Sequence, residues 1–312
     1  MTRIGAIDCG TNSIRLLIAD SHEGGLTDVH REMRIVRLGQ GVDATGQFAP
    51  DAIARTRAAL VDYAELLQDS DVQRVRMVAT SATRDAANRD EFFSMTAEVL
   101  GAVVPGATAE VITGTEEAEL SFHGAVAELD SGAAPFVVVD LGGGSTEVVL
   151  GDTAPQASLS MDIGCVRLTE RCLHSDPPTA AQVAAARDVV RANLAEALRV
   201  VPVQDAHTWV GVAGTFTTIA ALALQLTTYD AEVIHGSTVS FAQLLPVCAD
   251  LIAMTRKQRA ALGPMHEGRV DVIGGGAIVV QELAEAFHAR AGISTLTVSE
   301  HDILDGIALS LV

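Results

Sequence analysis

The sequence predicts an α/β protein built from two similar domains, each with a mixed β-sheet covered by helices. Three observations support this prediction. The chain has 312 residues, which is enough for two separate hydrophobic cores. A strand–turn–strand motif occurs twice, about one domain apart, at residues 6–17 and 138–149. Strand-like and helix-like segments also alternate through both halves, an order typical of layered α/β proteins.

The first half has the predicted order β-β-β-α-β-α-β-α. Residues 3–20 predict a hairpin, and residues 27–41 predict a third strand that ends in a glycine loop. Pro50 marks the start of a long helix, because proline is favoured at the first helical position. A buried strand ending at Thr80, a helix over 90–100, a short strand "AEVIT" and a helix beginning at "GTEEAEL" follow.

The second half repeats this alternation. A turn-rich segment at 129–135 predicts the boundary between a domain of residues 1–130 and a domain of residues 131–312. The predicted elements, in chain order, are strands at 136–140, 145–151 and 156–162, helices from 164 and 179, a strand at 208–214, helices from 216, over 240–254 and over 269–290, a strand in "STLTVS" and a helix over 301–311.

Composition restricts the functional class. No apolar run is long enough to span a membrane and no signal peptide precedes the first strand, so we expect a soluble, cytoplasmic protein. The net charge of −19 argues against binding to nucleic acid or to an anionic membrane. Four scattered cysteines without a C-x-x-C motif are expected to be reduced, and nine histidines without H-E-x-x-H argue against a zinc site. Any metal is expected to be a hard cation held by carboxylates.

The two copies of the strand–turn–strand motif align without a gap. One reads "AIDCGTNSIRLL" from residue 6, and the other reads "VVDLGGGSTEVV" from residue 138. The alignment places Asp8 on Asp140, and it places Arg15 on Glu147. A duplicated unit of this kind predicts two turns that face each other across a cleft between the domains.

Both turns predict phosphate binding, because backbone N–H groups can converge on an anion where no Cβ intervenes. Hydroxyl groups in the same turns add further donors. An ordinary glycine-rich hairpin is the alternative interpretation. The predicted phosphate-binding residues of the turns are Gly10, Thr11, Asn12, Ser13, Gly142, Gly143, Gly144 and Ser145.

Acidic residues flank the turns and predict a metal ion. Asp140 and Glu147 lie on opposite arms of one hairpin, so their carboxylates can approach each other. Two carboxylates beside a phosphate would repel it unless a cation intervened, and Mg²⁺ or Mn²⁺ resolves that conflict. Asp8, the counterpart of Asp140, is included among the predicted metal ligands. The alternative is that Asp140 only caps the turn.

Further candidates lie where predicted strands give way to turns, the edge at which α/β sheets bind ligands. Arg84 follows a buried strand by one turn and can hold a phosphate with its forked guanidinium, although a surface arginine beside Asp85 is the alternative. Gly214 and Thr215 form the turn after the strand at 208–214 and are also predicted to bind phosphate.

Glu116 and Glu117 occupy the first turn of the helix that begins at "GTEEAEL". Acidic residues there interact favourably with the helix dipole, so a purely structural role explains them without any chemistry. A catalytic carboxylate is the second interpretation, and the residue pattern alone leaves both open.

Together these motifs resemble the family of exopolyphosphatases and guanosine pentaphosphate phosphohydrolases, within the superfamily of actin, sugar kinases and the large heat-shock chaperones. The resemblance covers essentially the whole chain. It rests on seven segments in the family's order: "AIDCGTNSIRLLIAD", "ATSATRDA", "VITGTEEAEL", "VVVDLGGGSTEVVLG", "DIGCVRLTE", "GVAGTFTTIAAL" and "VSEHDILDGI".

The resemblance implies two actin-like (ribonuclease H-like) domains with mixed sheets and an interdomain cleft, together with Mg²⁺-dependent phosphatase activity. In the family the second glutamate of the Glu-Glu pair is catalytic, which implies that Glu117 is the general base. Asp140 and Glu147 match the family's metal-associated acids, and Arg84 matches an arginine that contacts phosphate. The family also often forms dimers, so a homodimer is an expectation.

Two departures from the family limit what is carried over. Many relatives have Arg-Glu-Gly near the C-terminus, where this chain has Leu304-Asp305-Gly306, so no role is assigned there. Longer relatives add a helical region that helps to bind long polyphosphate, and this chain ends at Val312. We therefore expect short-chain polyphosphate, or a nucleotide with a terminal phosphate, to be the better substrate.

The predicted function is hydrolysis of the terminal phosphoanhydride of inorganic polyphosphate. Removal of the 5′-phosphate of guanosine pentaphosphate is the nearest alternative, and guanosine alarmones are candidate partners. A small-molecule or acid kinase would need an adenosine pocket where "GVAGTFTTIAA" lies. A non-catalytic sensor of polyphosphate or alarmones is the alternative of another class.

Overall fold

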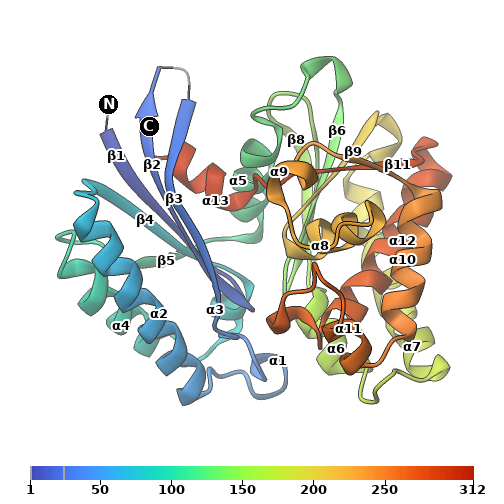
Figure 1. Cartoon of the computed structure of the whole chain (residues 1–312), viewed down its shortest axis with the longest axis horizontal. Helices are drawn as coiled ribbons and strands as arrows, with labels where there is room; N and C mark the ends of the chain where they lie inside the picture. The colour runs from blue at the N-terminus through green and yellow to red at the C-terminus, as the bar shows by residue number, and fades with distance from the viewer. Residues whose placement is uncertain (1, 24) are drawn as a thin grey trace. The chain divides into compact units, whose positions relative to one another are not determined.

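The computed structural model describes residues 2–23 and 25–312 and divides into two compact units. Unit 1 extends to Gly124 and also includes Ile303–Val312, whereas unit 2 is Ala125–Asp302. Each unit contains one mixed sheet with helices packed on it (Figure 1). The predicted boundary at residue 130 stays a prediction, but these contacts group the C-terminal residues with the first half of the chain.

The sheet of unit 1 has the strand order β3-β2-β1-β4-β5. Its first three strands form an antiparallel meander that contains the predicted hairpin, and β4 and β5 add to it in parallel. The three parallel strands β1, β4 and β5 therefore end at the same edge of the sheet. The strands are β1 (Thr2–Cys9), β2 (Ser13–His22), β3 (Gly25–Ile35), β4 (Arg74–Ala79) and β5 (Ala109–Val111).

Helices cover both faces of this sheet, because successive side chains of a strand point to opposite faces and both sets are apolar here. One core joins Ile7 and Leu16 to α2 and α4, and the other joins Ala6 and Leu17 to α5 and α13. As predicted, α2 begins at Pro50. The helices are α1 (Val42–Thr45), α2 (Pro50–Asp69), α3 (Ser81–Asp85), α4 (Arg89–Gly101), α5 (Gly114–Val126) and α13 (Ile303–Leu309).

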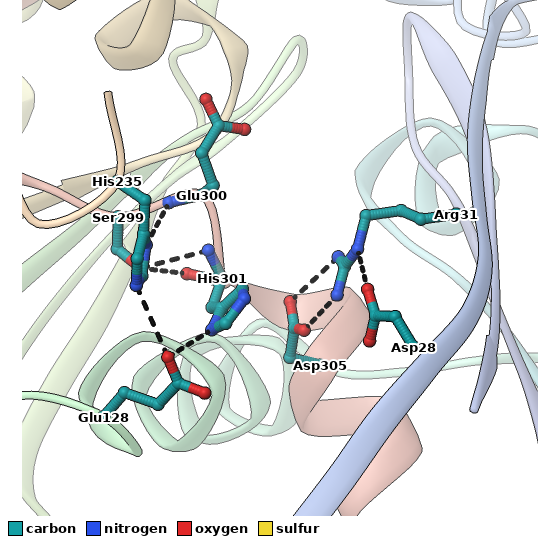
Figure 2. Close-up of polar contacts among 8 residues, drawn as sticks. All are labelled: Asp28, Arg31, Glu128, His235, Ser299, Glu300, His301 and Asp305. Atoms are coloured by element: carbon teal, nitrogen blue, oxygen red, sulfur yellow. Dashed lines mark hydrogen bonds and ion pairs between the residues drawn. The ribbon is translucent and has the colours of Figure 1, made fainter. Parts of the chain in front are cut away.

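Helix α13 packs on unit 1 through the segment where the sequence departs from the family pattern. A Cβ on Gly306 would lie 2.0 Å from the carbonyl oxygen of Leu120, so only glycine lets α13 lie directly against α5. Asp305 accepts hydrogen bonds from Arg31 of β3 at 2.5 and 3.3 Å, and Arg31 also donates to Asp28 (Figure 2). The Asp305-Gly306 pair therefore has a structural explanation.

The sheet of unit 2 has the order β10-β11-β9-β6-β7-β8. Strands β6, β7 and β8 repeat the antiparallel meander, and β9 and β11 extend it in parallel. Strand β10, which was not predicted, pairs antiparallel with β11. The strands are β6 (Phe136–Leu141), β7 (Thr146–Gly151), β8 (Pro155–Met161), β9 (Thr208–Val212), β10 (Thr238–Ser240) and β11 (Thr295–Val298).

The core of unit 2 is centred on Trp209 of β9, whose ring meets Phe216, Phe241 and Phe287 edge to face at 5.2–5.8 Å. The last long helix begins at Ile273 rather than at 269, because Glu267–Arg269 forms a separate 3₁₀ turn. The helices are α6 (Cys165–Cys172), α7 (Ala180–Val200), α8 (Gly214–Ala223), α9 (Ala231–Ile234), α10 (Phe241–Ala253), α11 (Arg256–Ala260) and α12 (Ile273–Ala291).

Candidate functional site

The two glycine turns adopt the same backbone arrangement, as their sequence alignment predicts. In the first, Gly10 N donates to Ser13 O at 2.9 Å, and in the second, Gly142 N donates to Ser145 O at 3.1 Å. The ladders also match, since Asp8 lies opposite Arg15 in the same way that Asp140 lies opposite Glu147. The repeat in the sequence is therefore a repeat in structure.

The carbonyl groups of the second turn are anchored on one side. Gly142 O accepts a bond from Cys165 N at 3.0 Å, and Gly143 O accepts bonds from two amides in the first turn of α6 at 2.9 and 3.1 Å. Because C=O and N–H point in opposite directions across a planar trans peptide, the N–H groups of Gly143 and Gly144 point away from α6. Two neighbouring donors on one side of a turn form the kind of concavity that binds anions.

The first turn is anchored in the same manner by the segment after β3. Thr11 O accepts a bond from Gly39 N at 2.8 Å, and Asn12 O accepts bonds from the two amides at residues 36 and 37 at 3.1 and 2.9 Å. The N–H groups of Asn12 and Ser13 therefore point away from this segment. Both turns thus have the backbone geometry of an anion-binding loop.

The acidic residues distinguish the two turns. Arg15 donates to Asp8 Oδ2 through Nε and Nη2, at 2.9 and 2.8 Å, so the first turn carries an ion pair. Asp140 and Glu147 lie directly opposite each other and are both buried, with Ser160 of β8 donating to Glu147 Oε1 at 2.6 Å. Two buried carboxylates at neighbouring positions favour a cation between them, or a shared proton.

In unit 1, the structure joins two residues that were predicted separately. Arg84 Nη1 donates to Glu117 Oε2 at 2.7 Å and to Ile112 O at 3.1 Å. Arg84 therefore points at Glu117 instead of being a solvent-exposed arginine beside Asp85. Both residues follow the carboxyl ends of parallel strands, Arg84 after β4 and Glu117 after β5, at the edge where β1 leads into its glycine turn.

The two adjacent glutamates of α5 have different environments. The Glu117 side chain is 9% exposed and binds Arg84, whereas the Glu116 side chain is 42% exposed and binds Arg76 at 2.6 Å. Thr113 caps the helix through its hydroxyl, which accepts a bond from Glu116 N at 3.1 Å. The dipole explanation fits both residues, but only Glu117 is directed at another candidate site residue.

A third turn, between β9 and α8, brings in an arginine that sequence reasoning missed. Ala213 has φ +71°, a left-handed conformation that costs free energy for a residue with a Cβ. Arg269 Nη1 donates to Gly214 O at 3.2 Å and to Thr218 at 3.1 Å, and a Cβ on Gly214 would lie 2.0 Å from its guanidinium carbon. Gly214 is thus required for the guanidinium to lie against the turn.

Cys165 lies beside both turns of unit 2, and its thiol is protonated rather than activated. Its backbone amide binds the glycine turn, and its thiol interacts with Thr215. Burial raises the pKa of the Cys165 thiol to about 11, so it stays protonated at neutral pH. All four cysteines are free, as expected for reduced thiols.

The structure therefore groups the predicted residues by unit. The turn at Gly10 with Arg84 and Glu117 lies at one sheet edge of unit 1, and the turn at Gly142 lies with Gly214 at one sheet edge of unit 2, where β6 and β9 run parallel. In the part of the chain described, no helix has the length and apolar character that crossing a membrane requires.

Comparison with known sequences identifies related proteins over the full length. The profile of the Ppx/GppA phosphatase family matches residues 17–311. A Mycobacterium tuberculosis protein named exopolyphosphatase 2 is 70% identical over 315 residues, which cover 100% of this chain and 99% of that protein. A Fusobacterium nucleatum protein named bifunctional 3-dehydroquinate synthase/phosphatase is 30% identical, over 97% of this chain and 46% of its own length.

Solved structures show the same fold. The crystal structure of an exopolyphosphatase-like protein has a TM-score of 0.95 and 43% identity, over 99% of this chain and 98% of that one. The Aquifex aeolicus Ppx/GppA enzyme has a TM-score of 0.80 and 32% identity, with 99% of each chain covered. These matches confirm the family resemblance and the predicted α/β class with two mixed sheets.

Proposed function

Because the chain belongs to the Ppx/GppA phosphatase family, we propose that it is an exopolyphosphatase that hydrolyses the terminal phosphoanhydride of inorganic polyphosphate and releases orthophosphate. The name of the 70% identical relative supports this substrate. The observation that carries the reaction class is the Arg84–Glu117 contact, which holds a buried carboxylate beside a phosphate-binding group. Such a carboxylate can accept a proton from water next to the phosphorus atom.

Unit 1 supplies the base in this proposal. Glu117 deprotonates the attacking water, and Arg84 holds oxygens of the terminal phosphoryl group with the donors that remain on its guanidinium. The N–H groups of Asn12 and Ser13 and the hydroxyl of Thr11 bind further oxygens. Glu116 takes no part, because it forms an exposed ion pair with Arg76.

Unit 2 binds the charge of the phosphate chain. The N–H groups of Gly143 and Gly144 and the turn at Gly214 and Thr215 are the donors, and Arg269 adds a positive charge beside the latter turn. We propose that each glycine turn binds phosphate oxygens. This agrees with their identical backbone arrangement and with anchoring that directs the N–H groups of each turn to one side.

A divalent cation fits the carboxylates of unit 2. Asp140 and Glu147 are buried, directly opposite each other and rich in the hard oxygen donors that Mg²⁺ prefers. Mg²⁺, or Mn²⁺, would neutralise part of the negative charge of these two carboxylates and of the phosphate. Asp8 stays a predicted ligand, but its ion pair with Arg15 already supplies positive charge in the first turn.

Three finer statements belong to this proposal. The free cysteines agree with a reducing compartment, so we place the enzyme in the cytoplasm. Guanosine pentaphosphate is the second candidate substrate, since the matching family is described as Ppx/GppA phosphatases. The homodimer stays a prediction from family resemblance.

Phosphate release from polyphosphates of defined length and from guanosine pentaphosphate tests the substrate, each measured with Mg²⁺, with Mn²⁺ and with excess chelator. We expect faster release from polyphosphate and no release in chelator. Faster phosphate release from guanosine pentaphosphate would make that nucleotide the preferred substrate in place of polyphosphate. Saturable binding of both compounds without phosphate release under any metal would identify a sensor instead of an enzyme.

A further inference from the structure

A second polar cluster in unit 2 contains none of the residues assigned to the phosphate site. It consists of Glu128, His235 and His301, called here the His–Glu cluster (Figure 2). Glu128 lies two residues beyond the end of α5, His235 directly follows α9, and His301 lies two residues before α13. Three segments far apart in the sequence thus bring two imidazoles and one carboxylate together.

The two His–Glu ion pairs in the His–Glu cluster are longer than hydrogen bonds, and their length matches the spacing of two ligands on one metal ion. His235 Nε2 and His301 Nδ1 each lie 3.5 Å from Glu128 Oε2, and the three ligand atoms lie within 4.8 Å of one another. An N–H···O bond with a charged partner is about 2.7–2.9 Å long. Two ligands at the tetrahedral angle around Zn²⁺, with bonds of about 2.0–2.1 Å, lie roughly 3.3–3.4 Å apart.

The donor types agree with that geometry. Two imidazole nitrogens and one carboxylate oxygen form a common three-ligand set for Zn²⁺, in which water takes the fourth position. Mg²⁺ and Ca²⁺ prefer sites made entirely of oxygen. The Glu128 side chain is 62% exposed and the two histidines are partly exposed, so water has access to the fourth position. We propose that the His–Glu cluster is a Zn²⁺ site.

A neighbouring serine holds the segment that carries His301 in place, whereas His235 has a hydrogen bond that metal binding changes. Ser299 Oγ donates to His301 O at 2.8 Å and accepts from His301 N at 3.0 Å, which fixes the backbone that carries this ligand. Glu300 N donates to His235 Nδ1 at 3.2 Å. Coordination through Nε2 requires a proton on Nδ1, so metal binding must break the hydrogen bond that Glu300 N donates to Nδ1.

The site also has a defined place in the chain. The backbone passes between the two units at residues 124–125 and again at 302–303. Glu128 lies just after the first passage and His301 just before the second, so one ion would join the segments next to both passages. The inference does not depend on the proposed exopolyphosphatase activity, because no residue of the cluster takes part in it.

Titration calorimetry of the tag-free, chelator-treated protein with Zn²⁺ tests the proposal, with Co²⁺ as a spectroscopic probe. We expect one saturable Zn²⁺ site and the visible absorption of tetrahedral Co²⁺. Because loss of an outer-shell partner alone costs about 10–100-fold in affinity, His301→Ala and Glu128→Gln should each weaken binding on the order of 100-fold or more. His174→Ala, which changes an exposed histidine elsewhere, should leave the affinity unchanged.

One further variant and two further measurements make the result decisive. Circular dichroism and phosphate release should be unchanged in His301→Ala and Glu128→Gln, which shows that both are folded. Asp140→Asn should retain the Zn²⁺ site, and a loss there would place the ion at the phosphate site and overturn the proposal. Absence of saturable binding, or equal affinity in the wild type and in folded His301→Ala, would overturn it as well.

Discussion

Replacing Glu117 with glutamine removes the proposed base while keeping the shape of the side chain. The amide oxygen of glutamine can still accept the hydrogen bond that Arg84 Nη1 donates at 2.7 Å, so the local fold should persist. The amide cannot accept a proton from water at neutral pH. General base catalysis contributes about 10²–10⁴-fold, equivalent to about 3–5 kcal/mol of transition-state stabilisation. We expect kcat to fall by that factor.

The adjacent residue supplies a matched control. Glu116→Gln makes the same chemical change one position earlier on α5, in a side chain that is 42% exposed and bound to Arg76. An exposed ion pair contributes about 0–1 kcal/mol to stability, so this variant should keep near-normal turnover and a nearly unchanged melting temperature.

The assay measures phosphate release and polyphosphate binding in the same preparations. Glu117→Gln should bind polyphosphate with nearly wild-type affinity, because the amide keeps its contact with Arg84 and removes a negative charge. A variant that turns over within about fivefold of the wild type would refute the assignment, since a general base typically contributes about 100-fold or more. Equal losses in Glu116→Gln and Glu117→Gln would also refute it, because they would indicate damage to the helix.

Three further predictions concern the frame of the site. Gly164→Ala should raise KM for polyphosphate at least tenfold, because its Cβ would lie 2.4 Å from backbone of the second glycine turn, whereas Gly101→Ala, whose nearest neighbour is 3.8 Å away, should not. Arg15→Met should lower the free energy of unfolding by about 3 kcal/mol or more, measured by urea denaturation, and Asp8→Asn in the same chain should recover part of the loss. Cys165 should resist iodoacetamide at pH 8 in the folded protein. The reason is that a thiol whose pKa is raised to about 11 is only about 0.1% thiolate at this pH. Mass spectrometry of the alkylated protein before and after unfolding tests this.

Local signals in the sequence predict most of the fold. The alternation of apolar residues, Pro50 at the start of α2 and the glycine turns are all properties of short segments. The elements that were missed, such as α9 (Ala231–Ile234) and β10 (Thr238–Ser240), have only three or four residues. Elements of that length are set by tertiary packing, and their own sequences contain too few residues to show a period.

In the candidate site, too, contacts between neighbouring segments could be predicted from the sequence and contacts between distant segments could not. Pairing of Asp140 with Glu147 could be predicted because a hairpin register is set by its turn. The contact of Arg269 with Gly214 could not be predicted, because the two residues are 55 positions apart in the sequence. Only the absence of a Cβ at Gly214 leaves room for the guanidinium. The His–Glu cluster shows the same limit, since Glu128 and His301 have no spacing in the sequence that predicts their contact.

The duplicated hairpins explain why the proposed cation belongs to unit 2. Both hairpins place an aspartate at the same ladder position, but the residue opposite that aspartate differs in charge. In unit 1 that residue is Arg15, a fixed positive charge bonded to Asp8 at 2.8 Å. In unit 2 it is Glu147, which doubles the negative charge beside a turn whose N–H groups suit an anion. In the proposed function, the difference at this one pair of equivalent positions decides which turn needs a cation before it binds phosphate, and which turn already carries a positive charge.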